Sequence, residues 1–505
     1  MKNTEKQHKT IQGLTQENNN LKAENLYLKV ELERIRQLIS GKKTERFEAQ
    51  PDTQLKLDLF PEIVEKQDDT EETEILKYER KKPKKTKKIP VRNPIPEHLP
   101  RVTEIVEPKN LPEGAVKMKI LITEVLEYKP GRIFVRQIIR PQYVVPNPIK
   151  TTDFDADNVI LAAELPTSLP ILGSNASASL LAHIAVSKLV DHLPLYRQIQ
   201  MFKRQGIEFA SSTVNDWFKN TCILLTPLYD ALIKETLKSS YVQVDESPMP
   251  VLTKDKPCST HKGYMWVYYS PPNNLVFFDY DKSRGKEPPK KILENYSGTI
   301  QTDGYAAYKQ FEKNPDICLA ACGAHARRKF YESQKENLVV CNFVLAMFQK
   351  IYAIEKVIRE NQLSPEEILE IRTRESAPIM DELEKYLQEK QDETLPKSQT
   401  GKAIAYTLNL WDRLKVFLHD PAVLFDNNLI ENSIRPLALG RKNYLFAGSH
   451  EAAQRIAMMY SFFATCKRRD IEPFNWLKTT LEKISAHKAN RLYELLPGYK
   501  PKSKQ

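Results

Sequence analysis

The sequence predicts a multidomain α/β protein, and three observations lead to that prediction. The chain has 505 residues, more than one hydrophobic core usually organises, so we expect two to four domains. Residues 1–42 repeat with a period of seven, whereas residues 238–332 alternate segments typical of strands and helices. A helical stretch, 333–421, then separates this α/β part from its completion at 422–488. We therefore expect a mixed sheet with a large helical insertion.

Residues 1–42 are predicted to form a leucine-zipper-like coiled coil. One core position of the heptad holds Ile11, Asn18, Asn25, Leu32 and Ile39, and the other holds Leu14, Leu21, Leu28 and Ile35. Asparagine at two core positions favours two strands paired in register. The pattern predicts a homodimer or higher homo-oligomer through residues 11–39. The alternative is a single amphipathic helix packed on the protein's own body.

The charge balance favours a polyanionic partner. Lysine and arginine outnumber aspartate and glutamate by 76 to 65, which gives a net charge of +11 and a pI near 9.0. Nucleic acid is the first candidate and an anionic membrane surface the second. Residues 43–92 are predicted to be a charged linker that ends in a basic arm, Arg80–Arg92. Such an arm is either solvated and disordered or in contact with DNA phosphates.

Composition also bears on the compartment. No apolar run approaches the ~18 residues of a membrane span, and the first residues lack the apolar core of a signal peptide. The six cysteines are scattered and form no disulfide framework, which fits a reducing cytosol. We therefore expect a cytoplasmic, nucleoid-associated protein with no membrane partner and a basic tail at 489–505.

Two smaller regions precede the α/β part. Residues 93–160 are predicted to be a small β module whose two strands are joined by a turn at Lys129-Pro130-Gly131. Residues 161–237 are predicted to be helical, with a helix, a turn at Gln205-Gly206, and a second helix capped by Ser211 or Ser212. This pattern fits a helix-turn-helix DNA reader and a plain helical hairpin equally well.

The α/β part has a definite order of elements. Three consecutive strands are predicted at 240–253, 263–270 and 273–281, followed by a short helix at 286–296. Residues 298–311 are predicted to be a fourth strand that runs into a helix, and residues 317–332 a fifth strand followed by another helix. The ends of strands in such a sheet are where side chains converge on a shared site.

Three carboxylates lie at positions where they could meet. Asp245 ends the first strand ("VQVDES") and Asp303 ends the fourth ("IQTDGY"). Glu431 begins a helix capped by Asp426, Asn427 or Asn428. Gathered carboxylates repel unless cations neutralise them, and Mg²⁺ or Mn²⁺ prefers oxygen ligands. Two such ions would suit an in-line displacement at phosphorus. Taken singly, the three acids could be turn residues or, for Glu431, a salt-bridge partner of Arg435.

Basic and aromatic residues surround these acids in the sequence. Predicted contacts to phosphate or DNA are His325, Arg327, Arg328, Arg435, Arg441, Lys442, Tyr444 and, by stacking, Phe446. The alternative for His325 is a ring packed under the start of its helix. Cys322 and His325 form a C-x-x-H step which, with Cys318, could suggest zinc. No fourth ligand with suitable spacing accompanies them, so no zinc site is predicted.

The segments "DHLPLYRQ", "YVQVDESPMPVL", "TDGYAAY", "CGAHARRKF" and "NNLIENSIRPLALGRKNYLFAGS" closely resemble the insertion sequence sixty-six family of DDE transposases. The resemblance implies a ribonuclease H-like catalytic core with a helical insertion between the second and third acids, here 431 − 303 = 128 residues apart. It assigns Asp245, Asp303 and Glu431 as catalytic acids and as ligands of two Mg²⁺ or Mn²⁺ ions, and it favours Asp245 over Glu246. Glu451 is a weaker rival of Glu431.

The implied function is a transposase that binds the terminal inverted repeats of its element, cleaves the DNA and transfers the freed end to target DNA. Two alternatives stay open: a ribonuclease H-like nuclease without joining activity, and a non-catalytic DNA-binding regulator. Helper proteins encoded by the same element also stay open. Family members often carry a zinc-finger-like module, but no cysteine precedes Cys222 here. The β module is therefore predicted to be free of metal.

Overall fold

The computed structural model describes residues 131, 133–136, 142–146, 158–162, 169–253 and 259–500. The chain divides into two units, Lys56–Glu164 and a larger one that joins Leu165–Gln505 to Met1–Leu55. The predicted coiled coil, linker and basic arm lie outside the described residues, so those predictions stand as they were made.

In the smaller unit, strands β1 (Gln142–Pro146) and β2 (Asn158–Ala162) pair in an antiparallel hairpin. The sequence had predicted a strand immediately after the turn at Lys129-Pro130-Gly131. That prediction is wrong for residues 133–136, which form no regular structure. Phe134 and Val135 are more than four-fifths exposed. Without burial of one face, an apolar run gains little from forming a strand.

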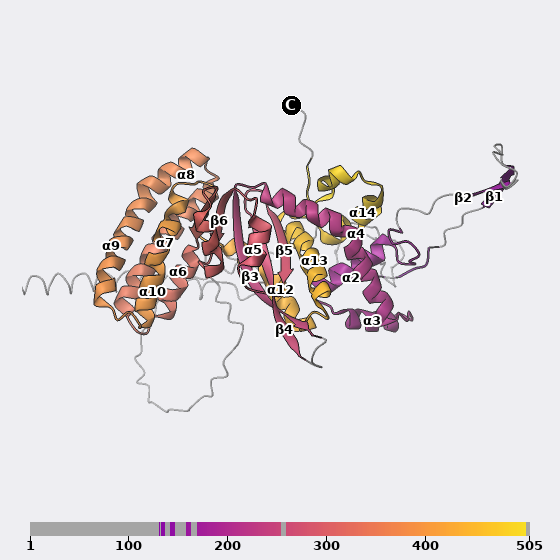
Figure 1. Cartoon of the computed structure of the whole chain (residues 1–505), viewed down its shortest axis with the longest axis horizontal. Coiled ribbons are helices and arrows are strands. Elements are labelled where there is room, and N and C mark those ends of the chain that lie inside the picture. The colour runs from indigo at the N-terminus through magenta and orange to yellow at the C-terminus, as the bar shows by residue number, and fades with distance from the viewer. Residues whose placement is uncertain are drawn as a thin grey trace, which may run out of the picture. The chain divides into compact units, whose positions relative to one another are not determined.

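The larger unit is built on a five-stranded mixed sheet with the order β5-β4-β3-β6-β7, as Figure 1 shows. Strands β3 (Tyr241–Leu252), β4 (Thr260–Ser270) and β5 (Leu275–Asp281) form an antiparallel meander. Strands β6 (Gly298–Thr302) and β7 (Ile317–Ala321) run parallel to β3. The predicted mixed α/β sheet is confirmed.

Helices connect and cover these strands. Helix α5 (Glu287–Leu293) links β5 to β6, and a 3-10 helix, η1 (Ala306–Lys313), stands where the sequence predicted an ordinary helix after β6. Helix α6 (Gly323–Glu332) follows β7. Helix α12 (Asn428–Tyr444) packs on β3 and β4.

Helix α13 (His450–Arg468) closes the open edge of the sheet at β5. Polar side chains of α13 accept hydrogen bonds from backbone N–H groups along that edge, at 2.8–3.3 Å. The pairs are Val276 with Thr465, Phe278 with Ser461, and Tyr280 with Gln454. An edge satisfied in this way does not offer its N–H groups to another strand.

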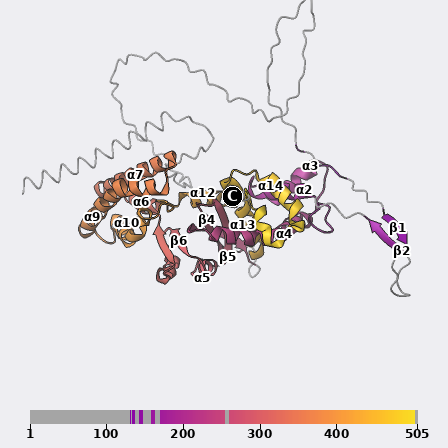
Figure 2. The same cartoon turned by 90° about the horizontal axis from the view of Figure 1, so that it is seen from above.

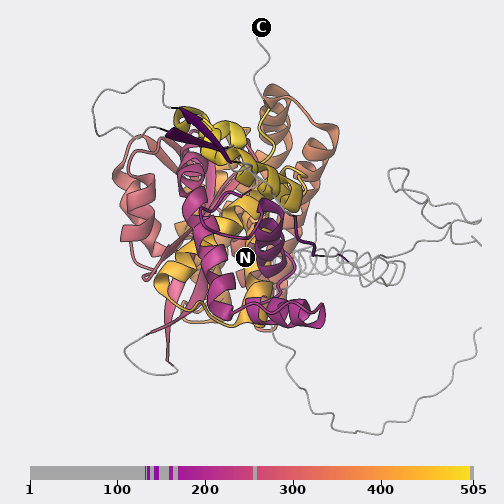
Figure 3. The ribbon, with the colours of Figure 1, turned by 90° about the vertical axis from the view of Figure 1, so that its right-hand side faces the viewer.

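Helices α2 (Ala178–Leu189), α3 (Leu195–Arg204) and α4 (Ser211–Leu237) precede the sheet. In Figure 3 they lie beside the C-terminal helices, and α14 (Pro473–Lys483) packs on α2. The predicted turn at Gln205-Gly206 is present, and Gly206 has a φ of 80° there. The predicted cap is wrong, because the helix already includes Ser211. Ala210 is the N-cap residue and makes no side-chain cap bond.

Between α6 and α12 the chain forms a helical insertion, which lies at the β7 side of the sheet in Figures 1 and 2. Its elements are α7 (Leu338–Asn361), α8 (Pro365–Ile371), a π-helical turn η2 (Arg372–Ser376), α9 (Ala377–Glu393), α10 (Gln399–Asn409), α11 (Trp411–Leu414) and a 3-10 turn η3 (Lys415–Leu418). These helices share an apolar core that continues to Phe425.

Helix α7 is, by length and composition, apolar enough to cross a membrane, which the sequence had not indicated. Half of its apolar window is buried. Val344, Met347 and Ile351 on this helix belong to the core of the insertion. Packing within the insertion therefore accounts for the apolar character of α7.

The chain continues beyond the point where a basic tail was predicted to begin. After α14 come two 3-10 segments, η4 (Ile484–Ala486) and η5 (Ala489–Leu495), and η5 packs on α4. Leu496 is 5% exposed. Residues 489–496 thus belong to the folded unit.

Candidate active site

Strands β3 and β6 bring Asp245 and Asp303 to the same level of the sheet. The two strands are parallel, and Gln243 pairs in register with Gln301. Asp245 lies two residues further along β3, and Asp303 lies two residues beyond Gln301, directly after β6 ends at Thr302. The prediction that Asp245 ends its strand is wrong, because β3 continues to Leu252. Side chains alternate between the faces of a sheet with a period of two, so each aspartate shares a face with the glutamine before it. Strand register therefore makes the two acids neighbours.

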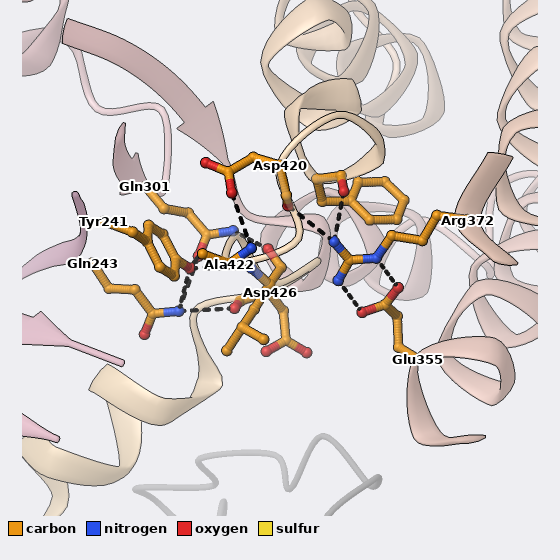
Figure 4. Close-up of polar contacts among 10 residues, drawn as sticks. Tyr241, Gln243, Gln301, Glu355, Arg372, Asp420, Ala422 and Asp426 are labelled. Carbon is orange, nitrogen blue, oxygen red and sulfur yellow. Dashed lines mark hydrogen bonds and ion pairs between the residues drawn. The ribbon is translucent and has the colours of Figure 1, made fainter. Parts of the chain in front are cut away.

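A buried polar network lies beneath these acids. Gln243, Gln301 and Tyr241 are fully buried. The Gln301 side-chain oxygen accepts hydrogen bonds from the Tyr241 hydroxyl (2.5 Å) and from Gln243 Nε2 (2.9 Å), as Figure 4 shows. A buried amide costs stability unless it is satisfied, so these bonds fix both side chains. The sequence did not predict this network, although Gln-x-Asp occurs both within β3 and at the end of β6.

The same network anchors the segment that leads to Glu431. Gln243 Nε2 donates to the carbonyl of Asp426 (3.1 Å), and Gln301 Nε2 donates to that of Leu424 (2.7 Å). The N–H of Gly323, at the start of α6, donates to the carbonyl of Phe425 (2.9 Å). A Cβ at Gly323 would lie 2.5 Å from the Phe425 ring, so only glycine allows this approach. The chain returning from the insertion is thereby fixed against both acid-bearing strands.

Helix α12 starts from this anchored segment and carries Glu431 in its first turn. Asn427 is the N-cap residue. The Asp426 carboxylate accepts from the backbone N–H (3.0 Å) and side chain (2.7 Å) of Asn428, while burial raises the pKa of Asp426 to about 6. The Cys322 thiol donates to Asn427 Oδ1 (3.0 Å), which gives this cysteine a structural role.

The electrostatics of Asp245 depend on the other acids. Burial, and then the negative charges of Glu246, Asp303 and Glu431, raise the pKa of Asp245 well above its usual value. Glu246 is engaged elsewhere: its Oε1 lies 2.6 Å from the Arg284 guanidinium, and its Oε2 accepts from the Tyr308 hydroxyl at 3.3 Å. Asp245 is therefore the strand residue that faces the other two predicted acids without an arginine partner.

Asp303 is held by the turn that follows it. Gly304 has a φ of 84°, and a Cβ there would lie 2.6 Å from the Leu410 side chain. This conformation favours glycine. It lets the Asp303 carboxylate accept from the N–H of Tyr305 at 2.8 Å. The Tyr406 hydroxyl, from α10, donates to the backbone carbonyl of Asp303.

Glu431 contacts two of the predicted phosphate-binding residues. Its Oε1 lies 3.6 Å from Arg328 and 3.9 Å from His325 Nε2. Burial lowers the pKa of His325 below its usual value, although Glu431 and Asp303 oppose that shift. A neutral imidazole at this position can donate a hydrogen bond but carries no charge. Arg327, also on α6, acts electrostatically on Tyr352.

The donor set fits a hard divalent cation in type and in charge. Three carboxylates from three elements act on one another, and the Asp245 carboxyl is buried among negative charges that a cation would offset. Across residues 169–253 and 259–500, no three His, Cys, Asp or Glu side chains form a group that could hold a metal ion as they stand. Direct coordination by all three acids would therefore require their side chains to move closer together.

The basic run after Glu431 has mixed surroundings. Arg435 is partly exposed and Lys442 is exposed. Arg441 donates to the carbonyl of Pro248, and the Tyr444 hydroxyl lies 3.3 Å from that of Tyr460. Phe446 is 39% exposed. Arg435, Lys442 and Phe446 are thus accessible to a ligand, whereas Arg441 and Tyr444 also have partners within the protein.

Glu451, the weaker rival of Glu431, lies in the first turn of α13 and is exposed. Its pKa is lowered by a hydrogen bond to Ser449. The carboxylates that raise the pKa of Asp245 include Glu431. Geometry therefore favours Glu431 as the third acid.

Comparison with known proteins identifies the class as a transposase. The profile described as "Transposase IS66 family" matches residues 173–455. This range covers more than half of the chain and contains all three acids. The chain belongs to the IS66 transposase family.

Further matches extend the likeness to both sides. Residues 461–497 match the "IS66 C-terminal element", and residues 27–103 match "Transposase C of IS166 homeodomain". The chain is 30% identical to the uncharacterized protein y4hP of Sinorhizobium fredii, over 93% of this chain and 88% of that protein. It is 31% identical to y4jD of the same organism, over 80% and 81% respectively.

Proposed function

We propose that the chain binds the terminal inverted repeats of an insertion sequence and catalyses metal-dependent strand cleavage and strand transfer with Asp245, Asp303 and Glu431. The observation that carries the proposal is the register of β3 and β6, in which Asp245 and Asp303 each follow the paired residues Gln243 and Gln301 by two positions. The mixed sheet and the helical insertion between the second and third acids support the ribonuclease H-like core that the resemblance implies.

The chain's residues divide the work of such a reaction. Bound Mg²⁺ or Mn²⁺ would activate the attacking oxygen and stabilise the leaving oxygen of an in-line displacement. Asp245 and Asp303 would hold the cations from the sheet, and Glu431 would complete the site from α12. Neutral His325 can donate a hydrogen bond to the phosphate, and Arg328 can offset charge on it. Direct transfer at phosphorus requires no covalent enzyme intermediate.

The partners follow from this chemistry. The substrates are double-stranded DNA at the element ends and at the target, and a homo-oligomer formed through residues 11–39 would hold two ends together. The homeodomain match at residues 27–103 supports a DNA-binding role for the N-terminal part.

A cleavage assay tests the proposal. Purified protein is incubated with labelled duplex carrying the DNA that flanks the gene, with Mg²⁺, Mn²⁺ or EDTA. We expect metal-dependent nicking at the repeat boundary, and on the order of 10³-fold slower nicking by Asp303→Asn, because one cation ligand loses its charge. Asp316→Asn, an exposed aspartate after η1, is the matched control.

The other outcomes separate the alternatives. Specific binding without cleavage in any metal would indicate a regulator and overturn the catalytic assignment. Cleavage without transfer of the freed end to target DNA would indicate a nuclease. Equal nicking by wild type and Asp303→Asn would show that Asp303 is not one of the catalytic acids.

A further inference from the structure

A second concave site lies at the opposite end of α12 from Glu431. Helices α2, α4 and α13 and the segment after α12 enclose a pocket of about 300 Å³. Three cationic side chains line it, Lys188, Lys219 and Arg455, and two aromatic rings, Phe218 and Phe446. Asp216 is the acid in the lining. Three positive charges against one negative charge favour an anionic ligand.

Lys188 is the most buried of these cations. Its Nζ lies 5.5 Å from the ring centroid of Phe218 and 5.8 Å from that of Tyr444. Burial lowers the pKa of Lys188 to about 8, and the Cys222 thiol is the group that opposes this shift. Within residues 169–253 and 259–500, Lys188 forms no ion pair with a carboxylate. A buried ammonium held by aromatic rings alone lacks the counter-charge that burial usually requires.

A residue with a strained backbone, Leu445, comes directly before the pocket residue Phe446. Leu445 ends α12 with φ 63° and ψ −48°, and the N–H of Phe446 donates to the carbonyl of Tyr444 at 2.7 Å. This is a γ-turn with positive φ, which is rare and costly for a bulky side chain. Its effect is to place Phe446 at the rim of the pocket. Strain of this kind persists only where the surrounding structure holds it in place.

The strained turn is held by the strand that carries Asp245. Ala447 donates to the carbonyl of Pro250 and accepts from the N–H of Leu252, both at 2.9 Å. The pocket wall is therefore fixed to the far end of β3.

Two independent paths give the separation between pocket and acids. Along α12, the fifteen residues from Glu431 to Phe446 span about 22 Å at 1.5 Å per residue. Along β3, the six residues from Asp245 to Val251, which bridges to Ala447, span about 20 Å. The pocket therefore lies about 20 Å from the acids, a distance at which both can contact one DNA molecule.

We propose that this pocket binds a backbone phosphate of the DNA about 20 Å from the scissile bond, through Lys188, Lys219 and Arg455, while Phe446 stacks on the adjoining sugar or base. The inference rests on the proposed function and names a DNA-binding subsite outside the acid cluster. Phosphate supplies the negative counter-charge that Lys188 lacks. The exposed Phe446 ring beside it can stack on any base.

Equilibrium binding with a matched pair of variants tests this proposal. Full-length wild type, Lys188→Met and the control Lys234→Met are titrated with labelled flanking duplex in EDTA at several salt concentrations. Lys234 is exposed, lies on α4 and does not line the pocket. For Lys188→Met we expect about tenfold weaker binding and a salt slope smaller by about 0.9, because one phosphate contact is lost. Lys219→Met, an exposed lining residue, should act in the same direction.

Duplex length sharpens the test. A duplex too short to extend about 20 Å beyond the cleavage point should bind wild type and Lys188→Met equally, because it cannot reach the pocket. Equal binding of the long duplex by Lys188→Met and Lys234→Met would overturn the proposal. If inorganic phosphate raises the melting temperature of wild type but not of Lys188→Met, while DNA binding is unchanged, the pocket is a site for free phosphate instead.

Folding and catalysis are checked separately. Lys188→Met should melt no lower than wild type below pH 8, because it removes a desolvated charge. The folded pKa of about 8 lies below the usual 10.5. Wild-type stability should therefore rise between these two pH values, and the difference from the variant should shrink. If wild type binds but never nicks DNA, the catalytic proposal fails while the binding difference still reports on the pocket.

Discussion

The helical insertion and the acid cluster formed by Asp245, Asp303 and Glu431 both hold charge away from solvent. The two regions neutralise that charge differently. In the insertion, Arg372 is 1% exposed and pairs with Glu355 at 2.7 Å. Its remaining N–H groups donate to the carbonyls of Phe417 (2.6 Å) and Asp420 (3.1 Å), as Figure 4 shows. In the acid cluster, partly buried Asp245 lies among three other carboxylates, and the charges that act most on its pKa are all negative.

The difference separates structural charge from functional charge. A buried charge that serves the fold is satisfied by the chain itself, because an unpaired one costs several kcal/mol. A buried charge that the chain leaves unneutralised requires a partner from outside. The following variants test whether the two regions behave in these opposite ways.

The largest expected effect is on stability in the insertion. Arg372→Ala should lower the free energy of unfolding by about 3–5 kcal/mol, because Glu355 and two carbonyls lose their partner. Urea denaturation of wild type and variant measures the difference. Arg374→Ala, two residues away, is the control: Arg374 pairs with Glu370 and Glu375 on the surface, and its loss should leave stability nearly unchanged. Equal losses for both variants would contradict the comparison.

An intermediate effect is expected in the network beneath the acids. Gln301→Leu should cost about 2 kcal/mol, because the Tyr241 hydroxyl, the Gln243 amide and the Leu424 carbonyl lose a buried partner. Metal-dependent nicking should also fall, since the segment leading to Glu431 is held less firmly. Gln310→Leu is the control, because Gln310 bonds only to the carbonyls of Lys286 and Ala307 near the surface. Unchanged nicking by Gln301→Leu would show that the buried network does not support the activity of the site.

The smallest effect should have the opposite sign. Without divalent metal at neutral pH, Asp245→Asn should be more stable than wild type by on the order of 1 kcal/mol, because it removes a desolvated charge. The folded pKa of Asp245 is raised above its usual value of 3.8. Its stabilising contribution is therefore complete below pH 3.8 and is lost as pH rises through the folded pKa.

Thermal melts across this pH range, with and without Mg²⁺, measure that difference. The advantage of Asp245→Asn should grow as pH rises, and added Mg²⁺ should stabilise wild type more than the variant. A variant that is less stable than wild type without metal would show that the Asp245 carboxylate is satisfied within the chain.

Local patterns predicted much of the α/β part, because short turns separate runs of strand-forming residues. Val242, Val244 and Phe277 are examples of such residues. The same patterns located Asp303 at the end of β6, but they wrongly ended the first strand at Asp245, because β3 continues to Leu252. Register between β3 and β6 is a long-range property, so the sequence could not show that the two acids are level. The repeated Gln-x-Asp was the available signal, since glutamine is unusual in a buried strand.

The pocket could not be predicted, because Lys188, Lys219 and Arg455 come from three helices far apart in the sequence. Lys188 looks like an ordinary helix-end lysine until packing between Phe218 and Tyr444 is known. The misplaced cap at Ser211 has a local cause. A serine before an apolar run fits an N-cap and a first-turn residue equally well, and here the helix begins one residue earlier than the pattern suggested.

The placement of the insertion between Asp303 and Glu431 has a consequence during synthesis of the protein. A ribosome adds about 5–20 residues per second, so roughly 10 s separate the emergence of the second acid from that of the third. Throughout that interval the growing chain holds two acids and lacks the helix that brings the third. In the proposed mechanism, a nascent or prematurely terminated chain that stops before α12 therefore cannot cut the DNA that encodes it.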